Sequence, residues 1–191
     1  VVPGEDEEAP EEPPPPAVYS GDYTNGKREG IGKMTFPDGS TYFGEWSNNA
    51  MHGEGTYKYS NGDIYSGCWV GGAKSGRGMY QFALTKYTPK PEEEKSDREK
   101  AGEKREEELY GPRKYRNDSS FDGDWVDGTI VSGTWTYKDG TTFTGPFMEG
   151  FPCGQGEYNY TSGNKQAGEF IRAQVADSED EFATKPKWIH G

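Results

Sequence analysis

A five-residue pattern, aromatic-x-Gly-x-aromatic, recurs at a fixed interval and constrains this chain more than any other feature. It occurs at residues 19–23, 42–46 and 65–69, so the first three copies begin 23 residues apart. Two more copies follow at 121–125 and 143–147, and a degenerate sixth start lies at 166–170. A constant period of this length predicts a repeat architecture in which each unit packs on its neighbours.

A second signal, Gly-x-Gly, follows most copies. In the fourth copy only Gly133 remains, and Val131 occupies the first position. Short runs that contain Asp-Gly or Asn-Gly lie at 37–40, 60–63 and 138–141, where they predict hairpin turns. We expect structural roles for these glycines of the two signals: Gly44, Gly53, Gly55, Gly67, Gly76, Gly78, Gly145, Gly154 and Gly156.

The spacing within each copy predicts a strand with one aromatic side. Residues i, i+2 and i+4 of a strand share a face, so Tyr42, Gly44 and Trp46 would lie on the same side. Because glycine has no side chain, a ring from the neighbouring strand can lie over it. Gly53, Gly55, Tyr57 and Tyr59 keep the same parity in the second strand. Each repeat therefore reads as a two-stranded hairpin with an aromatic face.

Consecutive hairpins of this kind predict an all-β fold, an extended single-layer antiparallel meander that resembles a solenoid. Composition agrees, because only 30% of the residues are hydrophobic while the chain holds 28 glycines and 13 tyrosines. Rings rather than aliphatic side chains must supply the buried area.

Five segments follow from this pattern. Residues 1–18 form an acidic, proline-rich arm, either disordered or in polyproline II conformation. Repeats 1–3 occupy 19–84, and repeats 4–5 with a partial repeat occupy 119–170. Between them, 85–118 is a charged insertion, either a solvated helix or disordered. The remainder, 171–191, reads as a flexible tail whose Trp188 and Ile189 mark a docking peptide or a frayed end.

The pattern Tyr-x-Gly-x-Trp-x-x-Gly-x-x-x-x-Gly-x-Gly resembles the MORN family (membrane occupation and recognition nexus), over residues 19–84 and 119–170. The resemblance implies an extended, curved, single-layer antiparallel sheet. The stretches 152–158 and 166–170, together with the acidic, proline-rich start, are similar to radial spoke head MORN-repeat proteins. That narrower likeness implies a structural subunit of motile cilia and flagella, in the axonemal cytoskeleton of the cytoplasm.

The residues that carry chemistry predict neither an enzyme nor a cofactor or metal site. His52 and His190 are the two histidines, and His52 precedes Gly53, where we expect a structural or exposed role. Two cysteines, Cys68 and Cys153, lie far apart and read as reduced thiols. A strand rather than a helix follows each Gly-x-Gly, which argues against a phosphate-binding loop.

The aromatic rows have two interpretations: they bury the sheet's own glycines, or they also contact a partner protein. A single-layer sheet cannot bury both faces by itself, so we expect some rings to meet a partner. Our candidates for that interface are Tyr42, Trp46, Tyr65, Trp69, Phe121, Trp125, Phe143, Phe147 and, in the tail, Trp188.

These observations favour a non-catalytic scaffold that docks other subunits of a large assembly, such as radial spoke head proteins, with a homodimer or heterodimer left open. The alternative is a module that recruits proteins to phosphoinositide membranes, which needs clustered bases. A third interpretation is the regulatory region of a kinase or methyltransferase. The net charge of −12 argues against nucleic acid and anionic lipid as partners.

Overall fold

The computed structural model describes residues 15–83, 118–174 and 184–190, and these residues form one antiparallel sheet of 13 strands. Of the predicted arm the structure describes residues 15–18 alone, and of the predicted insertion it describes residue 118 alone. The strands are β1 (Val18–Thr24), β2 (Lys27–Thr35), β3 (Thr41–Ser47), β4 (Ala50–Lys58), β5 (Ile64–Val70), β6 (Ala73–Gln81), β7 (Ser120–Val126), β8 (Thr129–Thr136), β9 (Thr142–Met148), β10 (Phe151–Pro152), β11 (Gly154–Asn159), β12 (Lys165–Gln174) and β13 (Thr184–His190).

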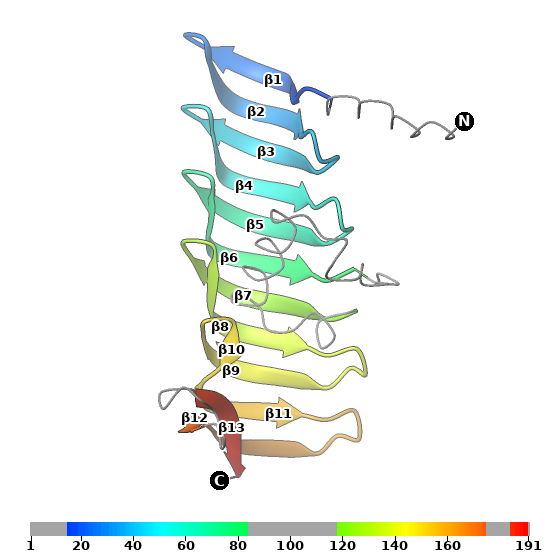
Figure 1. The fold of residues 1–191 in the computed structure, drawn as a ribbon, viewed down its shortest axis with the longest axis vertical. Coiled ribbons are helices and arrows are strands. Elements are labelled where there is room, and N and C mark those ends of the chain that lie inside the picture. The colour runs from blue at the N-terminus through cyan, green and yellow to red at the C-terminus, as the bar shows by residue number, and fades with distance from the viewer. Residues whose placement is uncertain (1–14, 84–117, 175–183, 191) are drawn as a thin grey trace, which may run out of the picture.

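Strand order in the sheet follows the order in the sequence. Each strand pairs with the next along the chain from β1 to β9, then β11, β12 and β13, while the short β10 pairs with β9 alone. Figure 1 shows the strands stacked as the rungs of a ladder, with β1 at one end and β12 and β13 at the other. The predicted all-β, single-layer meander of tandem hairpins is therefore confirmed.

A column of glycines crosses the sheet, one from each strand except β10 and β13. Gly21 faces Gly32, which faces Gly44, which faces Gly55. The column continues through Gly67, Gly78, Gly123, Gly133 and Gly145, and Gly156 faces Gly168 between β11 and β12. We call this column the glycine spine. Because side chains alternate along a strand, it fixes which residues share each face of the sheet.

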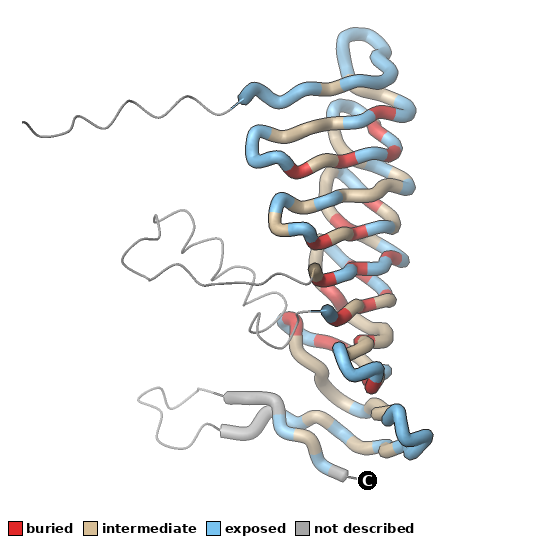
Figure 2. The backbone as a smooth tube through the Cα atoms, turned by 90° about the vertical axis from the view of Figure 1, so that its right-hand side faces the viewer, coloured by how far each residue is buried: buried red, intermediate tan, exposed pale blue. Residues whose placement is uncertain are grey.

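Buried and exposed residues alternate along the strands, as the parity of the repeat predicts. In β3, Tyr42, Gly44 and Trp46 are buried while Phe43 and Glu45 are exposed. Figure 2 shows buried positions recurring on successive strands, so the core is a band that runs along one face. We call this the aromatic face and the other the opposite face.

Two kinds of turn join the strands. At one edge, the hairpins from β1–β2 to β9–β10 each close with two residues of positive φ, as in Asn48 (50°) and Asn49 (69°) or Asp127 (47°) and Gly128 (83°), which is the type I′ geometry. At the other edge the predicted turns are confirmed. Gly39 has φ 82°, and its N–H donates to the Phe36 carbonyl while the Phe36 N–H donates to the Ser40 carbonyl.

The first glycine of each Gly-x-Gly makes a bulge. Gly53 has φ 54°, and the register between β3 and β4 shifts there from Gly44–Gly55 to Glu45–His52, so β4 holds two extra residues. In the fourth copy, where Val131 replaces this glycine, the register shifts by a single residue, from Asp124–Ser132 to Trp125–Ile130. Glycine is needed for the larger bulge because the left-handed conformation disfavours a Cβ.

The sheet continues across the insertion. β6 pairs with β7 in the same glycine-on-glycine register as the other repeats, and the Phe82 N–H donates to the Ser119 carbonyl at 2.9 Å. That bond is equivalent to the one between Phe36 and Ser40. The insertion therefore occupies the position of one hairpin turn.

The sheet also extends past the boundary at residue 170, which corrects the expectation of a tail from 171. β12 runs to Gln174, and β13 pairs with it antiparallel from Gly168–His190 to Gln174–Thr184. The partial repeat thus gains a second strand. Its sequence lacks the Gly-x-Gly signal, which is why the pattern did not predict it.

Candidate functional site

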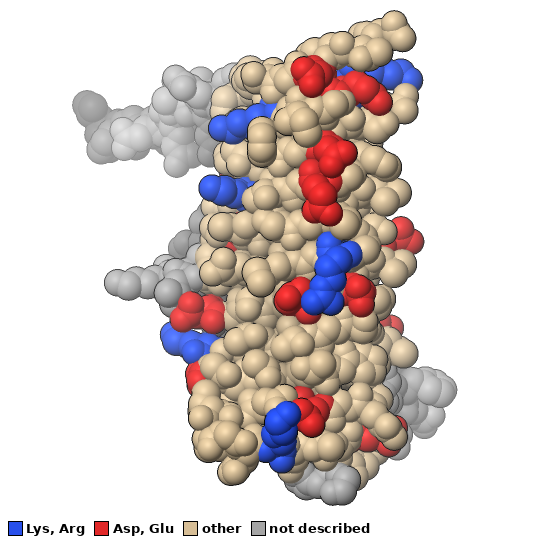
Figure 3. Space-filling model, turned by 180° about the vertical axis from the view of Figure 1, so that it is seen from behind, with Lys and Arg blue, Asp and Glu red and all other residues tan. Residues whose placement is uncertain are grey.

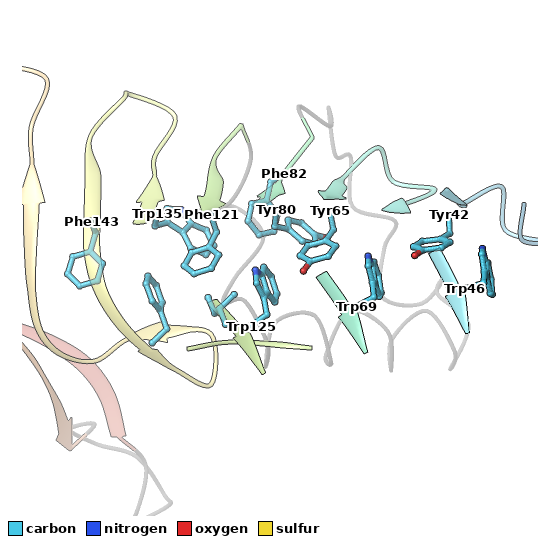
Figure 4. Close-up of a cluster of buried hydrophobic side chains, with 12 residues drawn as sticks. Tyr42, Trp46, Tyr65, Trp69, Tyr80, Phe82, Phe121, Trp125, Trp135 and Phe143 are labelled. Atoms are coloured by element: carbon cyan, nitrogen blue, oxygen red, sulfur yellow. The ribbon is translucent and has the colours of Figure 1, made fainter. Parts of the chain in front are cut away.

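The rings of the five-residue motif form the core of the aromatic face. Their first members, Tyr42, Tyr65, Phe121 and Phe143, have 0% exposure, and the last members, Trp46, Trp69, Trp125 and Phe147, have 1–5%. Figure 4 shows these rings aligned along the sheet from Trp46 to Phe143. Neighbouring rings meet edge to face; Trp46, for example, lies 5.2 Å from both Tyr19 and Tyr42. Such T-shaped contacts add stability beyond burial.

The tryptophans also join adjacent repeats through hydrogen bonds. The Trp46 indole N–H donates to the Gly32 carbonyl at 3.1 Å, and the Trp69 and Trp125 indoles donate to Gly55 and Gly78 in the same way. Each indole therefore reaches the spine glycine of the preceding strand. These bonds satisfy buried polar atoms that would otherwise weaken the fold.

The first ring of each motif covers the glycine spine. A Cβ at Gly55 would overlap the Tyr42 ring, and one at Gly78 would overlap the Tyr65 ring. The Tyr42 hydroxyl donates to the Glu45 carbonyl at 2.9 Å, and burial raises the pKa of this hydroxyl well above its ordinary value. The predicted pairing of ring and glycine is thus confirmed.

This geometry decides between the two interpretations for most of the predicted interface rings. The eight motif rings named above are buried by the sheet itself, so they form its core rather than an accessible docking surface. The ninth candidate, Trp188, belongs to β13 and also packs within the sheet. Its ring lies 4.9 Å from that of Phe170 and 5.2 Å from that of Tyr158, and it covers Gly168.

A second line of rings on the same face is less buried, and the sequence analysis did not select it as a surface. We call it the second aromatic row: Phe36, Tyr57, Tyr59, Tyr80, Phe82, Trp135, Tyr137 and Tyr158. From Phe36 to Trp135 each ring lies 4.5–5.6 Å from the next. Tyr80, Phe82 and Trp135 are buried, whereas Phe36, Tyr57, Tyr59, Tyr137 and Tyr158 are partly exposed. Their spacing of two or four residues after the spine glycines was the available signal.

Hydroxyl groups hold this row in place. The Tyr57 and Ser40 hydroxyls are 2.7 Å apart, and Ser40 in turn donates to Asp38 in the hairpin turn. Burial raises the pKa of Tyr57 and of Tyr137, and for Tyr137 the neighbouring Tyr158 hydroxyl raises it further. These tyrosines therefore stay protonated, and neutral, over the physiological pH range.

Two cations lie against the aromatic face. Lys74 Nζ is 4.7–5.3 Å from the ring centroids of Tyr80, Trp125, Tyr59 and Tyr65, and Lys74 is 8% exposed. The Arg28 guanidinium lies 4.6 Å from the Trp46 ring. Cation–π attraction compensates part of the cost of removing these charges from water. Neither residue was predicted, because nothing in the repeat pattern distinguishes this position.

The opposite face carries both signs of charge beside exposed apolar side chains such as Phe43 and Met79. Figure 3 shows charged side chains at intervals down its middle. Arg77 pairs with Asp122 at 2.9 Å and Lys165 with Glu157 at 3.3 Å. The Cys68 thiol donates to Glu54 at 3.0 Å, and this hydrogen bond, together with burial, raises the pKa of the thiol. Cys68 is therefore a poor nucleophile.

The described residues hold no group of three or more His, Cys, Asp or Glu side chains that could bind a metal ion. His52 is exposed, as the sequence analysis expected, and the His190 side chain lies outside the described part. Within residues 15–83, 118–174 and 184–190 we find no helix with the length and hydropathy that a membrane crossing requires.

The fold and its aromatic face define a repeat protein built from stacked β-hairpins. The family model described as MORN repeat matches residues 19–41, 42–64, 65–83 and 143–165. The chain therefore carries MORN repeats, four by this match, and such repeats indicate a binding or scaffold role. No curated protein matches the chain.

Proposed function

We propose that this chain is a non-catalytic structural subunit of the ciliary axoneme, in the head of the radial spoke, where it docks neighbouring protein subunits. The partly exposed second aromatic row is the observation that carries the docking role. Rings held at fixed spacing on a sheet lose little conformational entropy when a partner covers them, which favours them as anchors.

The sheet supports the role of a scaffold. Hydrogen bonds join each strand to the next from β1 to β9 and on through β11, β12 and β13, and each interface between repeats buries rings. The backbone N–H groups of Asn49, Gly72 and Gly128 in successive hairpin turns donate to carbonyls of the preceding hairpin, at Arg28, Met51 and Lys74, with distances of 2.8–3.1 Å. A stack joined in this way can hold partners at fixed distances from each other.

The axonemal placement has its support in the likeness of residues 152–158 and 166–170 to radial spoke head MORN-repeat proteins. Charge supports a protein partner over a lipid surface. Asp22, Glu45 and Glu54 recur along the opposite face, where Arg77 and Lys165 are engaged with carboxylates. Anionic lipid is attracted by clustered, free bases, which this arrangement does not offer.

The test is fractionation of cilia from cells that express the tagged chain. We expect the chain to stay with the axoneme when detergent removes the membrane, and to leave with radial spoke proteins when salt extracts the spokes. Release with the detergent fraction would instead support the membrane-recruitment alternative. A chain that remains in the cell body would contradict both.

A further inference from the structure

The N-terminal edge of the sheet, strand β1, is paired on one side only. Among the described residues, β2 is its single partner, whereas each strand from β2 to β9 pairs with a neighbour on both sides. Six of the seven residues of β1 are exposed. An edge strand of this kind presents a row of backbone N–H and C=O groups to which another strand can pair.

The stack of rings is also incomplete at this edge. Trp46 lies between two rings, those of Tyr19 and Tyr42, and is 5% exposed. Tyr23 occupies the equivalent position in the first copy, yet among the described residues its one ring contact is Tyr19, at 5.1 Å, and it is 60% exposed. A ring contributed from outside β1 would complete the arrangement that every later repeat has.

We propose that two copies of this chain pair through β1, antiparallel, around a twofold axis at Gly21. The motif Tyr19-Ser20-Gly21-Asp22-Tyr23 is nearly palindromic about its glycine, so two copies are complementary to each other. In this register Gly21 faces the partner's Gly21. That continues the glycine spine, whose rule of glycine opposite glycine holds at each pairing from β1 to β9.

The other facing pairs in this register are also compatible. Tyr19 faces the partner's Tyr23 on the aromatic face, as Tyr57 faces Tyr65 within the chain. On the opposite face Ser20 faces the partner's Asp22, where a hydroxyl can donate to a carboxylate. Val18, which is 59% exposed, faces the partner's Thr24. No like charges oppose each other, which is the condition for stable cross-strand pairs.

The C-terminal end of the sheet differs from β1. Its edge strand β13 contains Pro186, which has no N–H to donate, and proline is a common means of blocking an edge. Trp188 of the same strand already covers the last spine glycine, Gly168. Pairing through β1 therefore gives a closed dimer rather than a filament. This inference does not depend on the axonemal role, since it follows from the repeat geometry alone.

The test is the molar mass of the full chain in solution, measured by light scattering over a wide range of concentrations. We expect wild type to reach twice the chain mass. Ser20→Asp places a second carboxylate opposite the partner's Asp22 at two symmetric positions. We therefore expect the dissociation constant of the dimer to rise by about tenfold or more. Within its own chain Ser20 faces Lys33, so the substitution is compatible with the fold.

Ser66→Asp is the matched control, because Ser66 is also exposed on the opposite face but lies on the interior strand β5. It should dimerise as wild type does. The register is tested by mixing Val18→Cys and Thr24→Cys chains, which should form a disulfide between these two positions. A wild type that stays monomeric, a dimer that Ser20→Asp leaves unchanged, or a mixture without the 18–24 disulfide would overturn the proposal.

Discussion

The Tyr42 ring on β3 lies directly over Gly55 on β4, so that a methyl group at position 55 would overlap the ring. The same relationship joins Tyr65 to Gly78 and Phe143 to Gly156. Ring and glycine therefore form one packing unit that spans two strands. Repeating that unit produces the core, the register and the separation of the sheet into two unlike faces.

Gly55→Ala tests this unit directly. The added Cβ requires the Tyr42 ring to move out of its buried site, so we expect the free energy of unfolding to fall by about 1–3 kcal/mol, as for an overpacked core. Denaturant unfolding measures the change. Gly71→Asn is the control, because the equivalent turn position is held by Asn48 with φ 50°, and it should be nearly neutral. Equal losses in both variants would contradict this account.

Trp46→Ala should destabilise the sheet by about 3 kcal/mol or more, as truncation of a buried aromatic side chain does. The variant loses the indole hydrogen bond to Gly32 and the edge-to-face contacts with Tyr19 and Tyr42. Phe43, which lies three residues earlier on the same strand, is 59% exposed, so Phe43→Ala should change stability little. If thermal unfolding barely moved in Trp46→Ala, the ring would not be part of the core.

Stability should decrease in alkaline solution. Burial raises the pKa of Tyr42, Tyr57 and Tyr137 above the ordinary value of 10.0, so the folded chain holds these protons more tightly than the unfolded chain. Their contribution is fully present below pH 10.0 and is lost as the pH rises through the folded-state pKa values.

Tyrosinate absorbance and far-ultraviolet circular dichroism, followed together during titration, check this expectation. We expect the buried tyrosines to ionise only as the sheet unfolds, and Tyr137→Phe to shift unfolding to higher pH. Ionisation of every tyrosine near its ordinary pKa, with the sheet intact, would disagree with the structure.

Replacement of residues 83–118 by Pro-Asp-Gly should leave the sheet able to fold. β6 and β7 already pair in the register of the other repeats. A backbone hydrogen bond joins Phe82 to Ser119, as one joins Phe36 to Ser40 across the turn residues 37–39. We expect one cooperative unfolding transition and the same β-sheet circular dichroism. Two separate transitions would show that the insertion is needed to join the two groups of repeats.

Much of the fold could be predicted because one local rule repeats. The parity of Tyr42, Gly44 and Trp46 defines a face, and Asp-Gly and Asn-Gly define turns, so the meander follows without long-range information. The type I′ turns at the other edge were missed, although Asn25-Gly26 and Asp127-Gly128 are typical of them.

The site was harder to predict, because burial depends on which strand lies next to a ring. The motif rings were selected as partner anchors from residue type and position, yet neighbouring strands bury them. Trp188 was assigned to a flexible tail because β13 carries no repeat signal, and its place over Gly168 depends on contacts across β12. Lys74 is likewise explained only by the rings around it, of which Tyr59, Tyr65 and Trp125 lie outside its own strand β6.

The measurement that tests the scaffold role most directly is quantitative affinity purification of the tagged chain from a ciliated cell, compared between variants of the two faces. We expect radial spoke proteins to copurify with wild type in fixed proportion. These proteins should be lost from the double variant Phe36→Ala/Tyr137→Ala, provided that the circular dichroism of this variant shows a folded sheet. They should be retained by Phe43→Ala on the opposite face. Recovery of membrane proteins and lipid kinases instead, or no dependence on the aromatic face, would contradict the account.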